Sequence, residues 1–123
     1  MPSGLFEVRF RLELPHLERW AVERVRRVCV PTESGTVPIP VLSGNMPFSS
    51  CQARNLVQDR QSLTYEIACA GRGTARARAS YVLFPEEFSG RIAVTLGGKN
   101  MTMTEVQKGR RIGSCHPSPV ATP

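Results

Sequence analysis

Residues 5–14 read LFEVRFRLEL, and apolar and charged residues alternate from Phe6 onward. Successive side chains on a β-strand point to opposite faces, so this pattern predicts a strand with one buried and one solvated face. Pro15 ends the strand, because proline has no N–H to donate to a β-ladder. The buried face is predicted to comprise Phe6, Val8, Phe10, Leu12 and Leu14, and the solvated face Glu7, Arg9, Arg11 and Glu13.

The same period of two recurs along the chain and predicts about seven strands, nearly all joined by short turns. Between them, PEEFSG (85–90) and GGKN (97–100) are predicted turns, and a short turn of helix is allowed near 15–20 or 84–88. The strands are expected at residues 5–14, 20–30, 51–57, 62–69, 75–84 and 91–96, and from 101 onward. The predicted fold is therefore an all-β antiparallel meander that forms a curved sheet or a small barrel.

One long segment does not show this alternation of apolar and polar residues. Residues 31–48, PTESGTVPIPVLSGNMPF, contain four prolines and two Ser-Gly pairs, and they are predicted to form a long loop. Loops of this length are uncommon in a compact domain unless they are functional or tied down. Cys29 and Cys51 lie at its two edges, which suggests that disulfides hold it.

Length and charge favour one basic domain with anionic partners. The chain has 123 residues and a net charge of +6, with 14 arginines and 2 lysines. We expect one domain over residues 1–115, a Pro-rich tail over 116–123, and no transmembrane segment, because no run approaches twenty apolar residues. The aromatic residues are few and are not interleaved with arginine, which disfavours nucleic acid as a partner. The candidate binding residues are Arg76, Arg78, Arg110 and Arg111.

Four widely spaced cysteines, Cys29, Cys51, Cys69 and Cys115, predict two disulfides formed in an oxidising compartment. No C-x-x-C pair suggests a zinc ribbon, and four buried free thiols are the alternative. Cys51 and Cys69 flank a hairpin centred near Arg60, which favours Cys51–Cys69 with Cys29–Cys115. The second possibility is Cys29–Cys51 with Cys69–Cys115. The start, MPSGLFEV, lacks the features of a signal peptide, so export requires a leader that this chain does not contain.

Catalytic and metal-binding patterns are weak. Only His16 and His116 titrate near neutral pH, and no G-x-S-x-G, H-E-x-x-H or paired-carboxylate motif occurs, so we expect no enzymatic activity and no cofactor. Met101 and Met103 form an M-x-M pair of the kind that binds Cu(I). On a strand, such methionines more often belong to the core, so no metal site is predicted.

Five short motifs occur in order across residues 2–115: PSGLFEV, VCVPTE, CAGRG, MTMTEV and, at 109–115, GRRIGSC. Together with four cysteines they resemble a proteobacterial periplasmic family of unknown function, which runs from P-G-L-W-E to a terminal G-R-R-x-G-x-C. This chain departs from it at Phe6, where the family usually has Trp. The resemblance implies a periplasmic location and a cysteine pattern but no activity.

Two functions are compatible with these features. The first is a non-enzymatic, periplasmic or secreted accessory module that docks on an envelope complex or an acidic protein surface through its arginine-rich face and Pro-rich loops. The second is a small carrier of apolar ligands, with a pocket lined by Phe6, Phe10, Tyr65 and Ile92. An internal cavity favours the carrier, whereas a filled core with an exposed arginine stripe favours docking.

Overall fold

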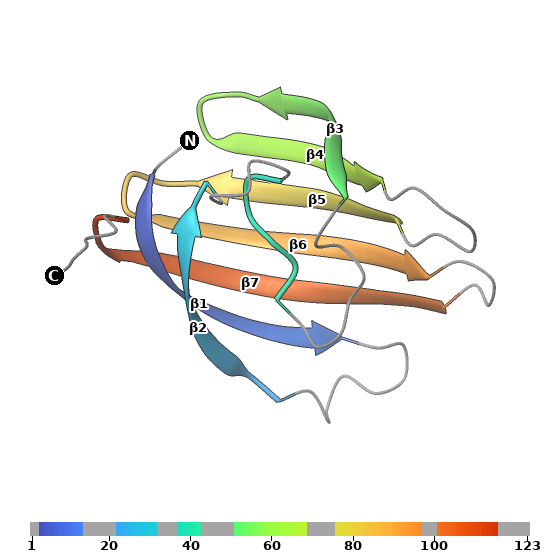
Figure 1. Cartoon of the computed structure of the whole chain (residues 1–123), viewed down its shortest axis with the longest axis horizontal. Coiled ribbons are helices and arrows are strands. Elements are labelled where there is room, and N and C mark those ends of the chain that lie inside the picture. The colour runs from blue at the N-terminus through green and yellow to red at the C-terminus, as the bar shows by residue number, and fades with distance from the viewer. Residues whose placement is uncertain are drawn as a thin grey trace, which may run out of the picture.

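The computed structural model describes residues 3–13, 22–31, 37–42, 51–68, 76–96 and 101–115. Within these ranges the chain forms one open, curved antiparallel sheet (Figure 1). Its strands are β1 (Gly4–Glu13), β2 (Arg24–Val30), β3 (Gln52–Gln58), β4 (Ser62–Ala68), β5 (Arg76–Leu83), β6 (Glu87–Leu96) and β7 (Met101–Gly113). The predicted all-β class with seven antiparallel strands is confirmed.

The order of the strands across the sheet is β2-β1-β7-β6-β5-β4-β3. Strands β3 to β7 form the predicted meander, in which each strand pairs with the next along the chain. The hairpin of β1 and β2 then joins the far side, because β1 pairs with β7 along almost its whole length. Strands β2 and β3 are the two edges, so the described sheet is open and the barrel alternative is wrong.

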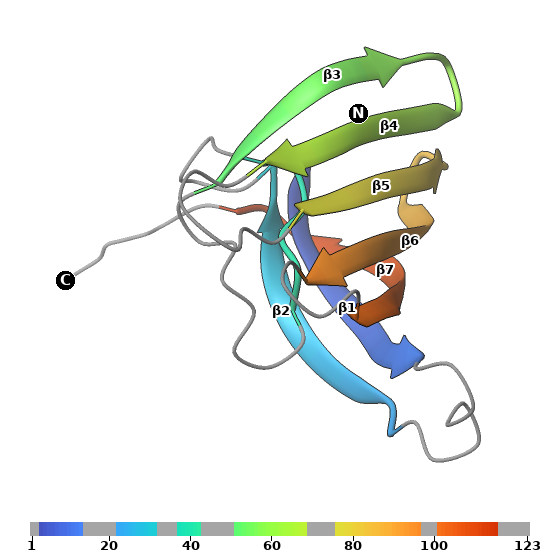
Figure 2. The same ribbon diagram turned by 90° about the vertical axis from the view of Figure 1, so that its right-hand side faces the viewer.

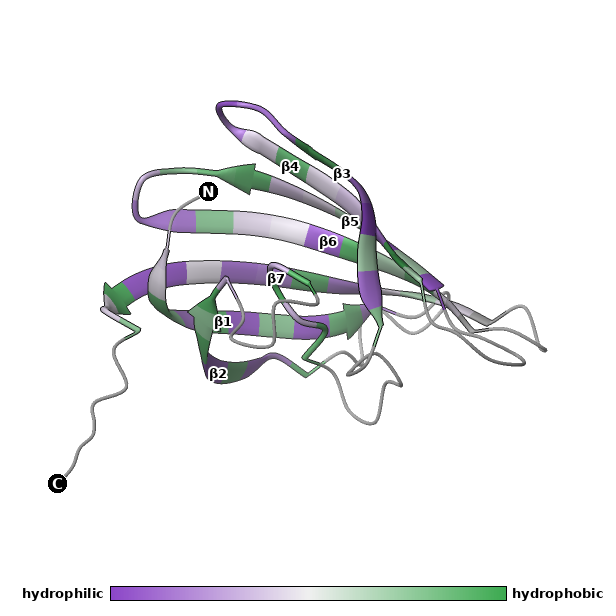
Figure 3. Cartoon of the chain, turned by 45° about the horizontal axis from the view of Figure 1, so that its top comes forward, coloured by the Kyte–Doolittle hydropathy of each residue, from purple (hydrophilic) through white to green (hydrophobic). Residues whose placement is uncertain are grey.

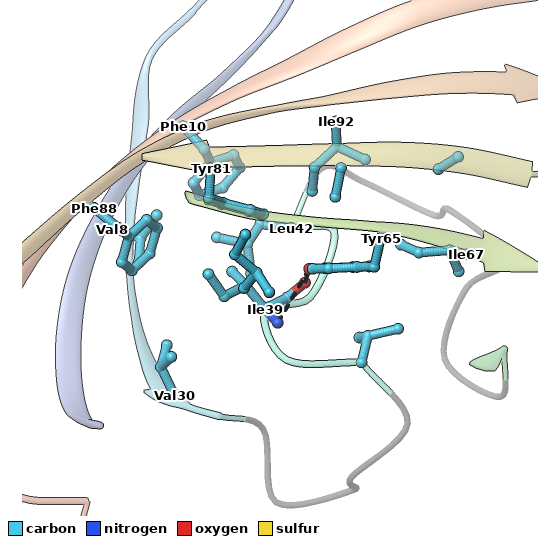
Figure 4. Packing of buried hydrophobic residues seen from close by; sticks show 14 of the residues in the cluster. Val8, Phe10, Val30, Ile39, Leu42, Tyr65, Ile67, Tyr81, Phe88 and Ile92 are labelled. Atoms are coloured by element: carbon cyan, nitrogen blue, oxygen red, sulfur yellow. Dashed lines mark hydrogen bonds between the residues drawn. The ribbon is translucent and has the colours of Figure 1, made fainter. Parts of the chain in front are cut away.

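The sheet is curved (Figure 2). Its inner face carries the buried side chains, and its outer face carries most of the charged ones. Hydropathy alternates along the strands accordingly (Figure 3). The largest fully buried apolar and aromatic side chains of the strands are Phe6, Val8, Val30, Leu63, Tyr65, Ile67, Tyr81, Phe88 and Ile92. Several of them converge on the inner face in Figure 4. The alternation predicted for residues 5–14 is confirmed over residues 6–13.

Strand β6 begins at Glu87, so the prediction of a turn over residues 85–90 is wrong after Glu86. Gly90 lies opposite Tyr81 and Gly109 lies opposite Phe88 in neighbouring strands. A Cβ atom at either glycine would overlap the facing aromatic ring. The glycines of these segments therefore leave room for aromatic rings over the sheet instead of ending strands. The helix allowed near 84–88 does not form, because residues 84–86 are irregular and β6 begins at Glu87.

The predicted loop contributes to the core. Residues 37–42, which we call the strap, have no strand pairing but cross the inner face (Figure 1). Val37, Ile39 and Leu42 are all buried. Sequence reasoning predicted the long loop from its four prolines and two Ser-Gly pairs, and did not place any of it in the core. The possible helix near 15–20 and the turn at 97–100 lie outside the described residues.

A disulfide joins Cys29 to Cys115, with 5.4 Å between the Cα atoms. It connects β2 to the end of β7, the two strands that flank β1, and excludes the pairing of Cys29 with Cys51. Cys29–Cys115 is the one disulfide with both cysteines in the described part of the chain, where two were expected. Cys51 is also disulfide-bonded, but Cys69 lies outside the described residues, so the pairing Cys51–Cys69 stays a prediction. The register supports it, because the pair Gln52–Ala68 is one step away.

Candidate functional site

The outer face of the described sheet carries more cations than carboxylates. It holds nine cationic and four acidic side chains, which come from all seven strands. The cations are Arg9, Arg11, Arg27, Arg54, Arg76, Arg78, Arg91, Lys108 and Arg110, and the acids are Glu7, Glu13, Glu66 and Glu87. Such an excess produces a positive field over the whole face, which attracts anionic partners.

Four ion pairs cross this face. Glu13 accepts from Arg11 and Arg91, each at 2.9 Å. The hydrogen bond from Arg11, supported by Arg91, lowers the pKa of the Glu13 carboxyl despite partial desolvation. The other two pairs, Arg78–Glu66 and Arg110–Glu7, are longer at 3.5 Å and their arginines are largely exposed. Exposed pairs of this kind stabilise a fold by less than about 1 kcal/mol, so these guanidinium groups remain available to a partner.

The four predicted binding arginines do not form one site. Arg76 and Arg78 lie on the outer face of β5, with alanines on the inner side. Arg110 also lies on the outer face, near β1 rather than β5. Arg111 points the other way, and its Nε donates to the carbonyl of Ser3 at 2.9 Å. Arg111 therefore contacts the N-terminal edge and does not share the outer face with the other three arginines, and its role in binding stays a prediction.

The pairing of β1 with β7 is irregular next to this arginine pair. The register between β1 and β7 shifts, so that Leu5 pairs with Gly113 while Phe6 pairs with Arg111. Ile112 is consequently an extra residue in β7, which defines a β-bulge. The bulge does not end the strand, which continues to Gly113.

A groove of about 420 Å³ lies on the outer face where β1, β7 and β6 meet. It is lined by Glu7, Arg9, Phe84, Glu87, Phe88, Ser89, Lys108, Gly109 and Arg110. Arg9 and Lys108 lie directly opposite each other in the pairing of β1 with β7. Sequence reasoning missed this juxtaposition, because the two residues are far apart in the chain. The alternation of residues 5–14 placed Arg9 on the solvated face, but no local signal placed β1 beside β7.

The inner face is closed by hydrogen bonds between the strap and the sheet. Tyr65 donates its hydroxyl to the carbonyl of Ile39 at 2.9 Å and accepts from the Ile39 N–H at 3.3 Å (Figure 4). Gln107 donates through Nε2 to the carbonyl of Pro40 at 3.0 Å. The Leu42 N–H donates to both carboxylate oxygens of Glu105, at 3.0 and 3.1 Å. Three side chains of the sheet thus form hydrogen bonds with backbone N–H and C=O groups of the strap, which has no strand partner to provide them.

These side chains are linked in a buried network. Tyr81 donates to Oε1 of Gln107 at 2.9 Å, and Nε2 of Gln107 also donates to Glu105. Glu105 and Gln107 are completely buried, and no buried side-chain polar atom in the described residues lacks a partner. A fully satisfied network of this kind fixes one arrangement of the core, since any displacement leaves buried polar groups unpaired. The strap is therefore positioned specifically over the sheet.

Burial raises the pKa of Tyr65 to about 12, because the phenolate is disfavoured away from water. Burial is also the main cause that raises the pKa of Tyr81, and Tyr65 and the Glu105 carboxylate raise it further. The unfolded chain releases both phenol protons near pH 10, whereas the folded protein retains them. The stability that these groups contribute is complete below pH 10 and is lost as the pH rises toward 12.

We therefore expect the free energy of unfolding to fall by about 2 kcal/mol per pH unit between pH 10.5 and 11.5, because the unfolded state has released nearly one proton more from each tyrosine. In Tyr65→Phe the slope should halve, because Tyr81 alone still titrates. Urea unfolding at several pH values measures both slopes. Equal slopes for the two proteins would contradict the assignment of this alkaline loss to Tyr65.

Neither a metal centre nor a membrane span is found in the described residues. They contain no group of three His, Cys, Asp or Glu side chains arranged around one point, and no helix long and apolar enough to cross a bilayer. Met103 is buried in the core, as expected. The side chain of Met101 and both histidines, His16 and His116, lie outside the described residues, so the remaining predictions about them are untested.

Comparison with known proteins yields one match. A family model described as "Protein of unknown function (DUF3617)" matches residues 1–115. No curated protein and no solved structure matches the chain. The match confirms the resemblance to a family of unknown function at that level.

Proposed function

We propose that this chain, which belongs to the DUF3617 family of proteins of unknown function, is a non-enzymatic interaction module that docks on an acidic protein surface through its outer face. The observation that carries this proposal is the excess of cations on that face. Most of them are arginines, whose planar guanidinium groups bind carboxylates through two parallel hydrogen bonds. A rigid sheet holds these groups at fixed spacings, which favours specific association over general attraction.

The strap over the inner face supports docking over the carrier function. Phe6, Phe10, Tyr65 and Ile92 lie together on that face, as the carrier hypothesis requires. The strap covers the face, however, and its side chains belong to the same core. An apolar ligand would have to displace the strap and break its hydrogen bonds to Tyr65, Gln107 and Glu105.

The proposed location is the periplasm or another oxidising compartment. The Cys29–Cys115 disulfide supports it, since such bonds persist where thiols are not kept reduced. Docking is assigned to the outer face rather than to the Pro-rich segment. Pro38 and Pro40 are half-buried in the strap, and the rest of that segment lies outside the described residues.

The test is salt-dependent capture from an envelope extract with charge-matched variants. Arg76→Gln/Arg78→Gln removes two charges from the outer face, and Arg24→Gln/Arg60→Gln removes two exposed charges elsewhere. We expect the wild type to capture a defined acidic protein, the first variant to lose about tenfold in affinity, and the second to lose little. Equal capture by all three proteins, or binding insensitive to salt, would refute docking through the outer face.

A further inference from the structure

The groove on the outer face contains an uncompensated pair of like charges. Arg9 and Lys108 are cross-strand partners, a position at which two cations repel and destabilise a sheet. The neighbouring cations have carboxylates: Arg110 pairs with Glu7, and Arg11 and Arg91 share Glu13. Within the described residues neither Arg9 nor Lys108 forms an ion pair. An anion placed between them would relieve the repulsion, so the groove favours an anionic ligand.

The groove also offers an apolar surface. Phe84 follows β5 at one end of the groove, and 44% of its surface is exposed. Its position is fixed by the turn into β6, in which the Phe84 N–H donates to the carbonyl of Glu87 at 2.8 Å. Gly109 lines the groove beside Lys108 through its backbone, because a side chain at this position would point to the inner face, toward Phe88. A ligand in this site contacts cations and an aromatic ring at once.

Two carboxylates restrict which anion fits. The row of residues across the sheet next to the Arg9–Lys108 pair alternates in charge, as Arg27, Glu7, Arg110 and Glu87. A continuous anionic surface such as a membrane would press headgroups against Glu7 and Glu87, which repel them. A single carboxylate on a peptide can lie between Arg9 and Lys108, whereas Glu7 and Glu87 lie in the neighbouring row. The volume of about 420 Å³ lies at the low end for ligand sites and suits one or two side chains.

We propose that this groove is a binding site for a short acidic peptide segment of the partner protein, in which an Asp or Glu side chain lies between Arg9 and Lys108 and a neighbouring apolar side chain packs on Phe84. The inference rests on the proposed docking function and specifies its recognition site. It assigns the specificity of the outer face to a groove in which charge and apolar surface coincide, while the remaining arginines provide general attraction.

The experiment selects peptides from a displayed library of random dodecamers on the wild-type protein, and then measures the affinity of one selected synthetic peptide. We expect selected sequences to carry Asp or Glu within two positions of a large apolar residue. Arg9→Gln/Lys108→Gln should weaken the peptide about tenfold or more, and Arg76→Gln/Arg78→Gln, with the same loss of charge, less than about threefold. Phe84→Ala should weaken it, whereas Val82→Ala, which also removes an exposed apolar side chain, should not.

Selected peptides without acidic residues would overturn the assignment of the groove as the recognition site. Equal losses of peptide affinity in Arg9→Gln/Lys108→Gln and Arg76→Gln/Arg78→Gln would do the same. Either result would leave the proposal of docking through the whole outer face intact. Vesicles of phosphatidylcholine and phosphatidylglycerol form a second arm. If vesicle binding requires Arg9 and Lys108, the ligand of the groove is a lipid headgroup, and the assignment to a peptide is overturned. The proposed docking function itself fails separately, when Arg76 and Arg78 make no difference to capture from the extract.

Thermal unfolding tests whether Arg9→Gln/Lys108→Gln weakens peptide binding only because it destabilises the fold. Because the pair is repulsive in the free protein, Arg9→Gln/Lys108→Gln should leave the melting temperature unchanged or raise it. A lowered melting temperature would show that these side chains stabilise the fold, and would overturn their assignment as a binding pair.

Discussion

Cys115→Ser is expected to lower the melting temperature of the oxidised protein by about 15 °C. The Cys29–Cys115 disulfide closes a loop with a sequence separation of 86, and it connects edge strand β2 to the end of β7. In the chain-entropy account, a loop of this length restricts the unfolded chain enough to contribute about 4.5 kcal/mol. For a domain of this size, each kcal/mol corresponds to about 3–4 °C in melting temperature.

Differential scanning calorimetry of the wild type, Cys115→Ser and Cys29→Ser/Cys115→Ser measures this effect. The double variant removes the unpaired thiol that the single variant leaves, so agreement between the two excludes thiol exchange as the cause. Ser114→Ala is the matched control at the adjacent position and should melt with the wild type. Identical melting temperatures for all four proteins would show that the disulfide contributes no stability in solution.

Local periodicity was sufficient to predict the strands but not the arrangement of all of them. The alternation at residues 75–84 placed Arg76 and Arg78 on the exposed side and alanines on the other, as observed. The hairpin from Cys51 onward was predicted with its turn, although a bulge at Asn55, which has a positive φ of 54°, was not. These features depend on neighbours in the sequence. The pairing of β1 with β7 does not, and no local pattern predicted it.

The groove and the strap were missed for the same reason. Arg9 and Lys108 meet only because β1 joins the far edge of the meander. The strap looked like a surface loop because Pro38 and Pro40 forbid regular strand pairing. Its backbone is satisfied by side chains of β4 and β7, a solution that depends on three-dimensional contacts. Sequence patterns therefore identified the faces of the sheet, while the sites on those faces required the topology.

Glu105→Ala is expected to lower the free energy of unfolding by about 3 kcal/mol. The change removes the acceptor of the Leu42 N–H and one partner of Gln107, and leaves buried donors without acceptors. Glu105→Gln should lower the free energy of unfolding by less, because its amide oxygen still accepts from the Leu42 N–H. Some loss remains, because its NH₂ group faces the NH₂ group of Gln107. Thr104→Ala, one position earlier on the outer face, is the control and should change stability by less than about 0.5 kcal/mol.

Hydrogen exchange separates loosening of the strap from general destabilisation. In the wild type the Leu42 amide is buried and bonded to Glu105, so it should exchange slowly. In Glu105→Ala it should exchange much faster under native conditions, while amides in the centre of β6 change only with global stability. Equal changes at both places would mean that the strap does not open independently of the sheet. Independent opening would mean that the buried Glu105 carboxylate helps to hold the strap over the apolar inner face without being needed for the sheet itself.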